Sequence, residues 1–145
     1  MHTPGLFKKK GGFAINSYFT FQVADNETAH PPRIHYHPDY EVYYLTDGVC
    51  RYFIHNKTYR LTAGDIVVIP PGLIHKVIYE SESHSRMLFN CTADYIPPSV
   101  RNVIHRLTYF SQRADTAKRI DSLYRRIREA HSRPDEFWED SLRCS

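Results

Sequence analysis

The feature of this sequence that most constrains its fold is a repeated alternation of short apolar runs and turn residues between Phe13 and Cys91. The runs are rich in β-branched and aromatic residues, and no helical stretch separates them, so each is typical of a β-strand. In chain order the expected strands are FAINSYFTFQV, RIHYH, YEVYYLT, VCRYFIH, TYRL, IVVI, LIHKVIY and RMLFNC. Turn sequences such as Asp47-Gly48 divide them. Short strands joined in this way predict an antiparallel sandwich or barrel.

The spacing of the apolar residues changes to that of a helix after Pro97-Pro98. Ser99 can cap a first helix, whose apolar positions are Val100, Val103, Ile104, Leu107 and Phe110. A second helix is expected to carry Ile120, Leu123, Tyr124, Ile127 and His131. A third begins at Ser132 with a start that resembles a capping box and reaches Ser145 without a C-cap signal. The sequence is therefore expected to stop inside a helix.

A chain of 145 residues has the size of one domain and can bury a substantial core. We expect an N-terminal arm at 1–12, a β domain at 13–97 and a helical segment at 98–145. The three cysteines are odd in number and form no CxxC pair, which argues against a disulfide framework and a zinc ribbon and fits a reducing cytoplasm. The run that follows the N-terminal lysines has strand-like alternation, so we expect neither a signal peptide nor a membrane span.

Positive charge is concentrated in the expected helical segment. Between residues 101 and 133 the sequence holds nine Lys or Arg residues against three acidic ones, Asp115, Asp121 and Glu129. Contact with DNA phosphates or with an acidic partner would use such a surface. A solvated helix face is the more ordinary explanation, because basic helices are common. The charge by itself therefore does not establish DNA binding.

The stretch RIHYHPDYEVYYLTDG, residues 33–48, places two histidines and a glutamate in expected strands. Alternate side chains of a strand share a face, so His35 and His37 point the same way, and Glu41 does so too if the intervening bend preserves the parity. The stretch GDIVVIPPGLIH brings a third histidine, His75, from a second strand. Three imidazoles and a carboxylate can hold Mn, Fe, Ni or Zn with one or two positions open. Without a metal, the same residues would hydrogen-bond to a polar small molecule.

Two tyrosines are expected to line the same site as candidate ligand-binding residues. Tyr43 has the parity of Glu41, and Tyr79 shares a strand face with His75, so both can face the interior. The tyrosines of opposite parity, expected to pack beneath helices or another sheet, are Tyr36, Tyr40 and Tyr44.

Both stretches resemble the sequence motifs of the cupin family. HYHPDYEVYYLTDG follows the order HxH, three residues, Glu, six residues, Gly, and GDIVVIPPGLIH follows the order Gly, five residues, Pro-x-Gly, two residues, His. The resemblance implies a mainly β fold, a cupin-type jelly-roll barrel of antiparallel strands followed by C-terminal α-helices. It gives the four metal-ligand positions to His35, His37, Glu41 and His75. A glycine and an asparagine of the motifs are replaced by Ala29 and Tyr79, and Tyr79 is expected to alter the pocket.

Over about residues 13–145 the chain also resembles the effector-binding domain of AraC-type transcriptional regulators. This resemblance implies a sensor of a small molecule, often a sugar, which forms a homodimer through its helices. DNA binding would belong to a C-terminal domain absent from this sequence. If both helices instead packed wholly on the barrel, the domain would be monomeric.

The competing hypothesis is a small metal-dependent cupin enzyme, such as a dioxygenase or a sugar isomerase, with an open metal position as its catalytic centre. The fold alone does not decide between these functions. We expect the sensor and no catalytic residues, because no separate acid/base pair accompanies the four ligands. The C-terminal helices would also lack an evident purpose in such an enzyme.

Overall fold

The computed structural model describes residues 12–16, 19–106 and 109–110, together with isolated helical residues between 122 and 129. The chain divides into two compact units, Met1–Ser111 and Gln112–Ser145. The sheets described below belong to the first unit. Most of the N-terminal arm, and most of the second and third expected helices, lie outside the described residues. No helix among the described residues is long and apolar enough to span a bilayer.

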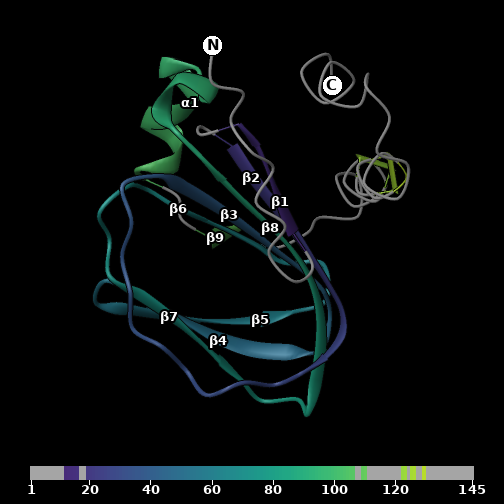
Figure 1. The fold of residues 1–145 in the computed structure, drawn as a ribbon. Helices are drawn as coiled ribbons and strands as arrows, with labels where there is room; N and C mark the ends of the chain where they lie inside the picture. Colours follow the sequence, from purple (N-terminus) through teal and green to yellow (C-terminus); the bar gives the residue numbers. More distant parts are fainter. Residues whose placement is uncertain are drawn as a thin grey trace. The chain divides into compact units, whose positions relative to one another are not determined.

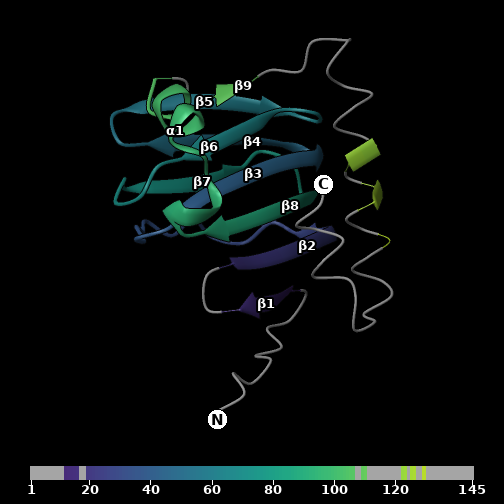
Figure 2. The ribbon, with the colours of Figure 1, turned by 90° about the horizontal axis from the view of Figure 1, so that it is seen from above.

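Two antiparallel sheets form the first unit (Figures 1 and 2). The six-stranded sheet has the order β1-β2-β8-β3-β6-β9, and the three-stranded sheet has the order β5-β4-β7. In chain order the strands are β1 Gly12–Asn16, β2 Phe19–Thr28, β3 Tyr40–Asp47, β4 Val49–Ile54, β5 Lys57–Thr62, β6 Ile66–Ile69, β7 His75–Tyr79, β8 Ser83–Cys91 and β9 Tyr109–Phe110. A 3-10 turn, Ala93–Tyr95, and one short helix, α1 Pro98–Ile104, lie between β8 and β9. The mainly β, jelly-roll-like fold expected from the sequence is confirmed.

The main core lies between the two sheets, because alternate side chains of each strand point toward the facing sheet. Its fully or nearly fully buried members are Tyr43, Leu45, Cys50, Tyr52, Ile54, Leu61, Val67 and Ile69. On β4 the alternation is regular, since Arg51 between two of these residues is exposed. The strand pattern of the sequence therefore identifies the inner faces correctly.

A second apolar cluster covers part of the outer face of the six-stranded sheet. Ile104 of α1 packs there with Tyr40, Val68 and Cys91. Figure 1 shows α1 above this sheet, on the side away from β4, β5 and β7. Of the three tyrosines expected on outer faces, Tyr40 and Tyr44 are buried, whereas Tyr36 is 72% exposed.

The first expected helix is shorter than its apolar spacing suggests. It begins after Pro97, which makes no side-chain cap, so the cap expected at Ser99 is wrong. Proline is favoured at the first helical position because its missing N–H needs no partner there. The helix ends at Ile104, and Tyr109–Phe110 pair with β6 as β9. At Phe110, backbone hydrogen bonding to the edge of the sheet therefore outweighs the helical spacing of the apolar residues.

Candidate metal centre

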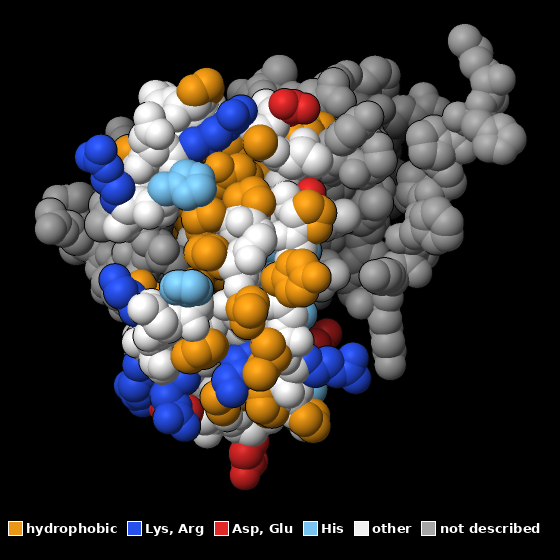
Figure 3. Space-filling model, turned by 90° about the vertical axis from the view of Figure 1, so that its left-hand side faces the viewer, with side chains coloured by type: hydrophobic (Ala, Val, Ile, Leu, Met, Phe, Trp, Pro, Cys, Tyr) orange, Lys and Arg blue, Asp and Glu red, His pale blue; other side chains and the backbone are white. Residues whose placement is uncertain are grey.

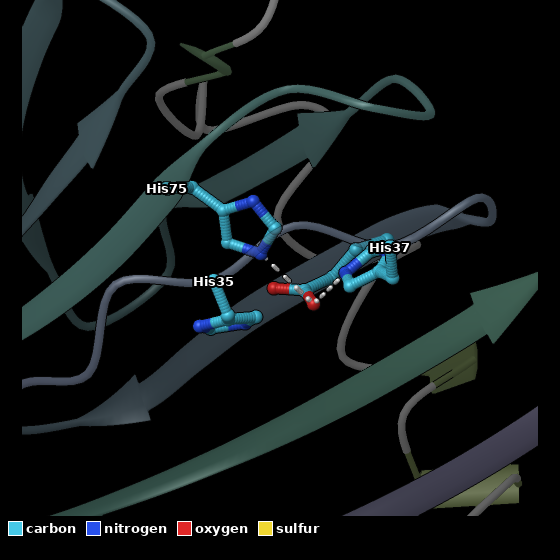
Figure 4. A group of neighbouring side chains, drawn as sticks. His35, His37 and His75 are labelled. Atoms are coloured by element: carbon cyan, nitrogen blue, oxygen red, sulfur yellow. Dashed lines mark hydrogen bonds and ion pairs between the residues drawn. The ribbon is translucent and has the colours of Figure 1, made fainter.

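The structure brings His35, His37, Glu41 and His75 together. One possible ligand atom from each lies within 4.8 Å of the corresponding atoms of the others. Figure 4 shows the three imidazoles converging on one region between the strands. His75 and Glu41 are buried, His37 is half-buried and His35 is exposed. The cluster therefore has a closed side and a side open to solvent.

His35 and His37 do not join this cluster through the alternation of side chains along a β-strand, as the sequence had indicated. The expected strand RIHYH is wrong, because only His35 of that stretch forms a β-bridge. The segment between β2 and β3 passes beside the three-stranded sheet before it returns to the other sheet (Figure 1). There the backbone N–H of His35 donates to the carbonyl of His75 at 3.1 Å, and the N–H of His75 donates back at 3.0 Å. Glu41 then follows on β3, so the cluster bridges the two sheets.

The turn before β7 holds the same segment in place. The N–H of Gly72 donates to the carbonyl of His37 at 2.9 Å. Gly72 has a φ of 80°, a conformation that glycine adopts without strain. The turn at Pro70-Pro71-Gly72, which is the Pro-x-Gly part of the second motif, therefore positions both His75, which follows it, and the segment that contains His37.

All three imidazoles are oriented by their Nδ1 atoms. Each Nδ1 lies within hydrogen-bonding distance of a backbone carbonyl two residues away. The carbonyls are those of Arg33, Asp39 and Leu73, at 3.1, 2.9 and 2.7 Å. Because a carbonyl only accepts, Nδ1 carries the proton, and Nε2 is left as the atom for the cluster. Backbone bonds to the second ring nitrogen are typical of metal-binding histidines.

Glu41 is held by several donors. The Tyr52 hydroxyl donates to Oε1 at 2.5 Å, and the Asn90 amide approaches Oε2 at 3.4 Å. His37 Nε2 lies 2.9 Å and His75 Nε2 3.6 Å from Oε2. Burial acts to raise the pKa of Glu41, but the adjacent imidazoles of His37 and His75 and the hydroxyl of Tyr52 outweigh it and hold that pKa well below its ordinary value. The hydrogen bond to Glu41, opposed by burial, raises the pKa of His37.

The residues present fit a divalent metal. They supply three oriented imidazole nitrogens and one carboxylate within a small region. In addition, the buried Nε2 of His75 forms no hydrogen bond and has Glu41 Oε2 only at 3.6 Å, which is costly for a polar atom inside a protein unless a ligand or ion contacts it. Such a nitrogen and oxygen set is compatible with first-row divalent metals.

The two expected pocket tyrosines lie deeper between the sheets. The hydroxyls of Tyr43 and Tyr79 are 3.2 Å apart. Tyr43 packs edge-on against Tyr52 with ring centroids 4.9 Å apart, and Tyr52 stacks beside His75 at 6.3 Å. A continuous row of aromatic rings thus joins the tyrosine pair to the histidine cluster.

Sequence reasoning missed Tyr52 and Asn90, both of which contact Glu41. The alternation of β4 identifies Tyr52 as an inward residue, which is a signal that could have found it. Asn90 lies directly across from Glu41 on β8, but that pairing joins residues far apart in the sequence and no local pattern indicates it.

Solved structures of cupins are similar in fold. The Cnp3 cupin domain of Schizosaccharomyces pombe is 11% identical, with a TM-score of 0.50 over 62% of this chain and 60% of that chain. A cupin-2 domain containing protein from Shewanella frigidimarina is 22% identical, with a TM-score of 0.45 over 54% of this chain and 74% of that chain. A Bacillus subtilis oxalate decarboxylase with Mn(II) centres is 18% identical, with a TM-score of 0.47 over 72% of this chain and 35% of that chain.

A search of curated protein sequences gave no match. By contrast, the family model described as the AraC-like ligand binding domain matches residues 16–143, which is most of the chain. This match confirms the resemblance seen in the sequence and agrees with the two-sheet fold. The chain therefore belongs to the AraC-like ligand binding domain family.

Proposed function

We propose that this chain is the effector-sensing and dimerisation domain of an AraC-type transcriptional regulator. A small polar molecule, with a sugar as one candidate, binds beside the histidine cluster and the Tyr43–Tyr79 pair. The observation that carries the proposal is the set of three imidazoles whose Nδ1 atoms are fixed by backbone carbonyls, in a chain of a ligand-binding family. Tyrosine rings and hydroxyls beside such a cluster suit a sugar, which offers both flat apolar surface and hydroxyl groups.

A divalent metal, Mn, Fe, Ni or Zn, is part of this proposal. The Nε2 atoms of His35, His37 and His75 and the carboxylate of Glu41 would hold it. When bound, it would supply a Lewis-acid centre for oxygen atoms of the effector. Tyr52 and Asn90 keep the carboxylate of Glu41 in position whether or not an effector is present.

A binding role is favoured over catalysis by the neighbours of the cluster. Burial, reinforced by the charge of Glu41, raises the pKa of Tyr52 well above its ordinary value. The phenol therefore remains a hydrogen-bond donor to Glu41 and is a poor proton shuttle. One observation favours the alternative, a small metal-dependent cupin enzyme: the exposure of His35 leaves the cluster accessible to a substrate.

The remaining parts of the proposal concern the whole regulator. The second unit carries an exposed apolar side chain, Leu123, which suits a helical dimer interface. A two-fold dimer would place two DNA-binding domains on two half-sites. In this proposal DNA binding belongs to a domain C-terminal to residue 145, and the regulator acts in the cytoplasm.

Metal titration of the purified chain tests the proposed centre. We expect uptake of one divalent ion, measured by elemental analysis and by calorimetry with Mn²⁺ and Zn²⁺. His35→Asn should lose most of this affinity and still fold, because His35 is exposed. His55→Asn is the matched control, since His55 is also exposed and has a φ of 54°, which asparagine tolerates. No uptake by the parent chain, or equal affinity of the two variants, would exclude this centre.

Turnover distinguishes the two functions. A sensor should bind its effector, raise the midpoint of thermal unfolding and leave the molecule chemically unchanged. Chemical conversion of a bound sugar or related metabolite, followed by mass spectrometry over hours, would favour the enzyme instead.

A further inference from the structure

A second group of polar side chains lies between the sheets, away from the histidine cluster. On β8 the residues His84, Arg86, Leu88 and Asn90 alternate onto one face. Asn90 is at the metal end, where it contacts Glu41. Arg86 is four residues away, which is roughly 13 Å along a strand. His84 and Arg86 therefore belong to a different part of the interior from the four candidate metal ligands.

His84 is completely buried and polar. Its exposed fraction is 0%, and the ring of Tyr79 stacks on it with centroids 3.7 Å apart and an interplanar angle of 18°. His30 approaches both rings edge-on. Neither ring nitrogen of His84 has a hydrogen-bond partner, although the carbonyl of Glu27 lies near the ring. Burial, together with the charge of Arg86, lowers the pKa of His84 to about 4, so its ring offers one N–H donor at neutral pH.

Arg86 brings a positive charge into the same region. The residue is partly buried and its side chain hydrogen-bonds to Tyr79, but its Nη1 is shielded from solvent and has no hydrogen-bond partner. Its guanidinium carbon lies 6.0 Å from the centroid of the Tyr43 ring. The cross-strand neighbours of Arg86 are Ala24 and Leu45, and neither can neutralise the charge.

Two exposed arginines, Arg51 and Arg60, differ from Arg86 in this respect. Arg51 and Arg60 both form ion pairs with Glu80. Arg86 forms no ion pair with any residue in the described part of the chain. A guanidinium whose nitrogen is shielded from water normally has an anionic partner, because leaving its charge unpaired is costly. Tyr79, the hydrogen-bond partner of Arg86, is neutral because burial raises its pKa, so an anionic group of a ligand can pair with the Arg86 charge.

We propose that Arg86 and His84, with the hydroxyls of Tyr43 and Tyr79, bind a carboxylate of the effector. This inference rests on the proposed sensing function and specifies the chemical class of the effector. A guanidinium matches the two oxygens of a carboxylate with two parallel N–H donors. The region holds one fixed positive charge, which a singly charged carboxylate balances and a doubly charged phosphate exceeds. The tyrosine hydroxyls suit hydroxyl groups on the same molecule, so the effector is a sugar acid or a similar hydroxy acid.

Glucuronate and glucose provide a matched pair of probes, because they share a ring and differ in a carboxylate. Titrations of the full chain by calorimetry, at constant ionic strength, should show at least about tenfold tighter binding of glucuronate. Arg86→Met should abolish this preference, whereas Arg51→Met, at an exposed arginine, should preserve it. Arg86→Lys keeps the charge without the planar donor pair and should weaken glucuronate binding about tenfold. The lysine variant keeps the test decisive if Arg86→Met does not fold.

Three outcomes would overturn the carboxylate site: equal affinity for the two probes, no binding of either probe or of gluconate at millimolar concentration, or an unchanged preference in Arg86→Met. Binding of glucose that is unaffected by Arg86→Met would leave the sensor proposal standing without this site. Arg86-dependent binding of glucuronate accompanied by its chemical conversion would support the site and contradict the sensor.

Discussion

Tyr52 links the aromatic core to the candidate metal centre through a single hydroxyl. This hydroxyl donates to Oε1 of Glu41, and both residues are buried. Removing a donor from a buried carboxylate leaves the oxygen without its partner, which costs about 1–3 kcal/mol. Tyr52 thus stabilises the fold and orients the carboxylate through one contact.

We predict that Tyr52→Phe lowers the free energy of unfolding by about 1–3 kcal/mol. It should also weaken binding of Zn²⁺ or Mn²⁺ by roughly 10–100-fold, as is usual for residues that orient a metal ligand. Urea denaturation and calorimetry measure the two effects. Tyr36→Phe, at a tyrosine that is 72% exposed, is the control and should change neither. Unchanged metal affinity in Tyr52→Phe would show that Glu41 does not depend on this hydrogen bond.

His84 predicts a pH dependence of stability. Its pKa is about 4 in the folded protein and is ordinarily about 6.5, so the unfolded chain binds the proton more tightly. Protonation of His84 therefore favours the unfolded chain. The free energy of unfolding has its full value above pH 6.5 and decreases as the pH falls toward 4. The shift corresponds to at most about 3 kcal/mol. His37, whose pKa is raised, contributes the opposite slope.

Comparison with His84→Phe isolates the effect, because phenylalanine keeps the stacking on Tyr79 and does not titrate. We predict that the difference in unfolding free energy between the parent chain and this variant changes by up to about 3 kcal/mol between pH 7 and pH 4.5. The contribution of His37 is common to both proteins and cancels. Parallel stability curves would mean that the folded state does not depress the pKa of His84.

At the scale of elements, the two turns that contain Gly48 and Gly72 have different roles. Both glycines have positive φ, at 92° and 80°. A Cβ at Gly48 would lie 2.7 Å from Ser81 Oγ and 2.9 Å from the Ser83 carbonyl, whereas a Cβ at Gly72 would meet nothing within 4 Å. Substitution at Gly72 is therefore limited by backbone strain alone. Substitution at Gly48 combines strain with a steric clash.

We predict that Gly72→Ala costs about 1–2 kcal/mol of stability, and that Gly48→Ala costs more. Metal binding should be weakened more by Gly72→Ala than by Gly48→Ala. Gly72 lies in the turn that leads to His75, and its N–H holds the His37 segment, whereas Gly48 is remote from the cluster. Urea denaturation and Zn²⁺ calorimetry of both variants measure these effects. A larger affinity loss in Gly48→Ala would contradict this assignment of the turns.

The sequence predicts the strands well where alternation is strong, as in β4, because inward and outward residues differ in polarity there. It also identifies the four clustered side chains through their motifs. It does not predict how His35 and His37 arrive, since their segment is placed by backbone bonds to His75 and Gly72. The interior pair Arg86 and His84 is not predicted either, because the unpaired nitrogen atoms of these two side chains become visible only once both sheets are assembled.

At the scale of the whole molecule, exposed apolar residues indicate where copies of the chain can associate. In the first unit, Ile34 and Tyr36 flank the bridged His35, and Ile74 precedes His75; all three side chains are exposed. Figure 3 shows apolar side chains gathered on the side of this unit that faces the viewer, with basic and histidine side chains around them. In the second unit Leu123 is 41% exposed. These are two separate candidates for a dimer interface.

We predict a homodimer that forms through the second unit, because apolar residues recur there at helical spacing while Leu123 stays exposed. Leu123→Asp should weaken the dimer by about 2 kcal/mol or more, which is roughly thirtyfold in Kd. Ser122→Asp, at the neighbouring exposed position, introduces the same charge and should leave the dimer intact. Sedimentation velocity between micromolar and nanomolar concentrations measures both variants against the parent chain.

The face of the first unit provides the competing interface, and one further variant separates the two. A dimer held together by that face would dissociate with Tyr36→Asp and persist with Leu123→Asp. A dimer held together by the second unit would dissociate with Leu123→Asp and persist with Tyr36→Asp, because Tyr36 belongs to the first unit, in the segment beside the histidine cluster. A parent chain that is monomeric at micromolar concentration would contradict both interfaces. It would also remove the simplest way in which the proposed effector binding could be communicated to the proposed pair of DNA-binding domains.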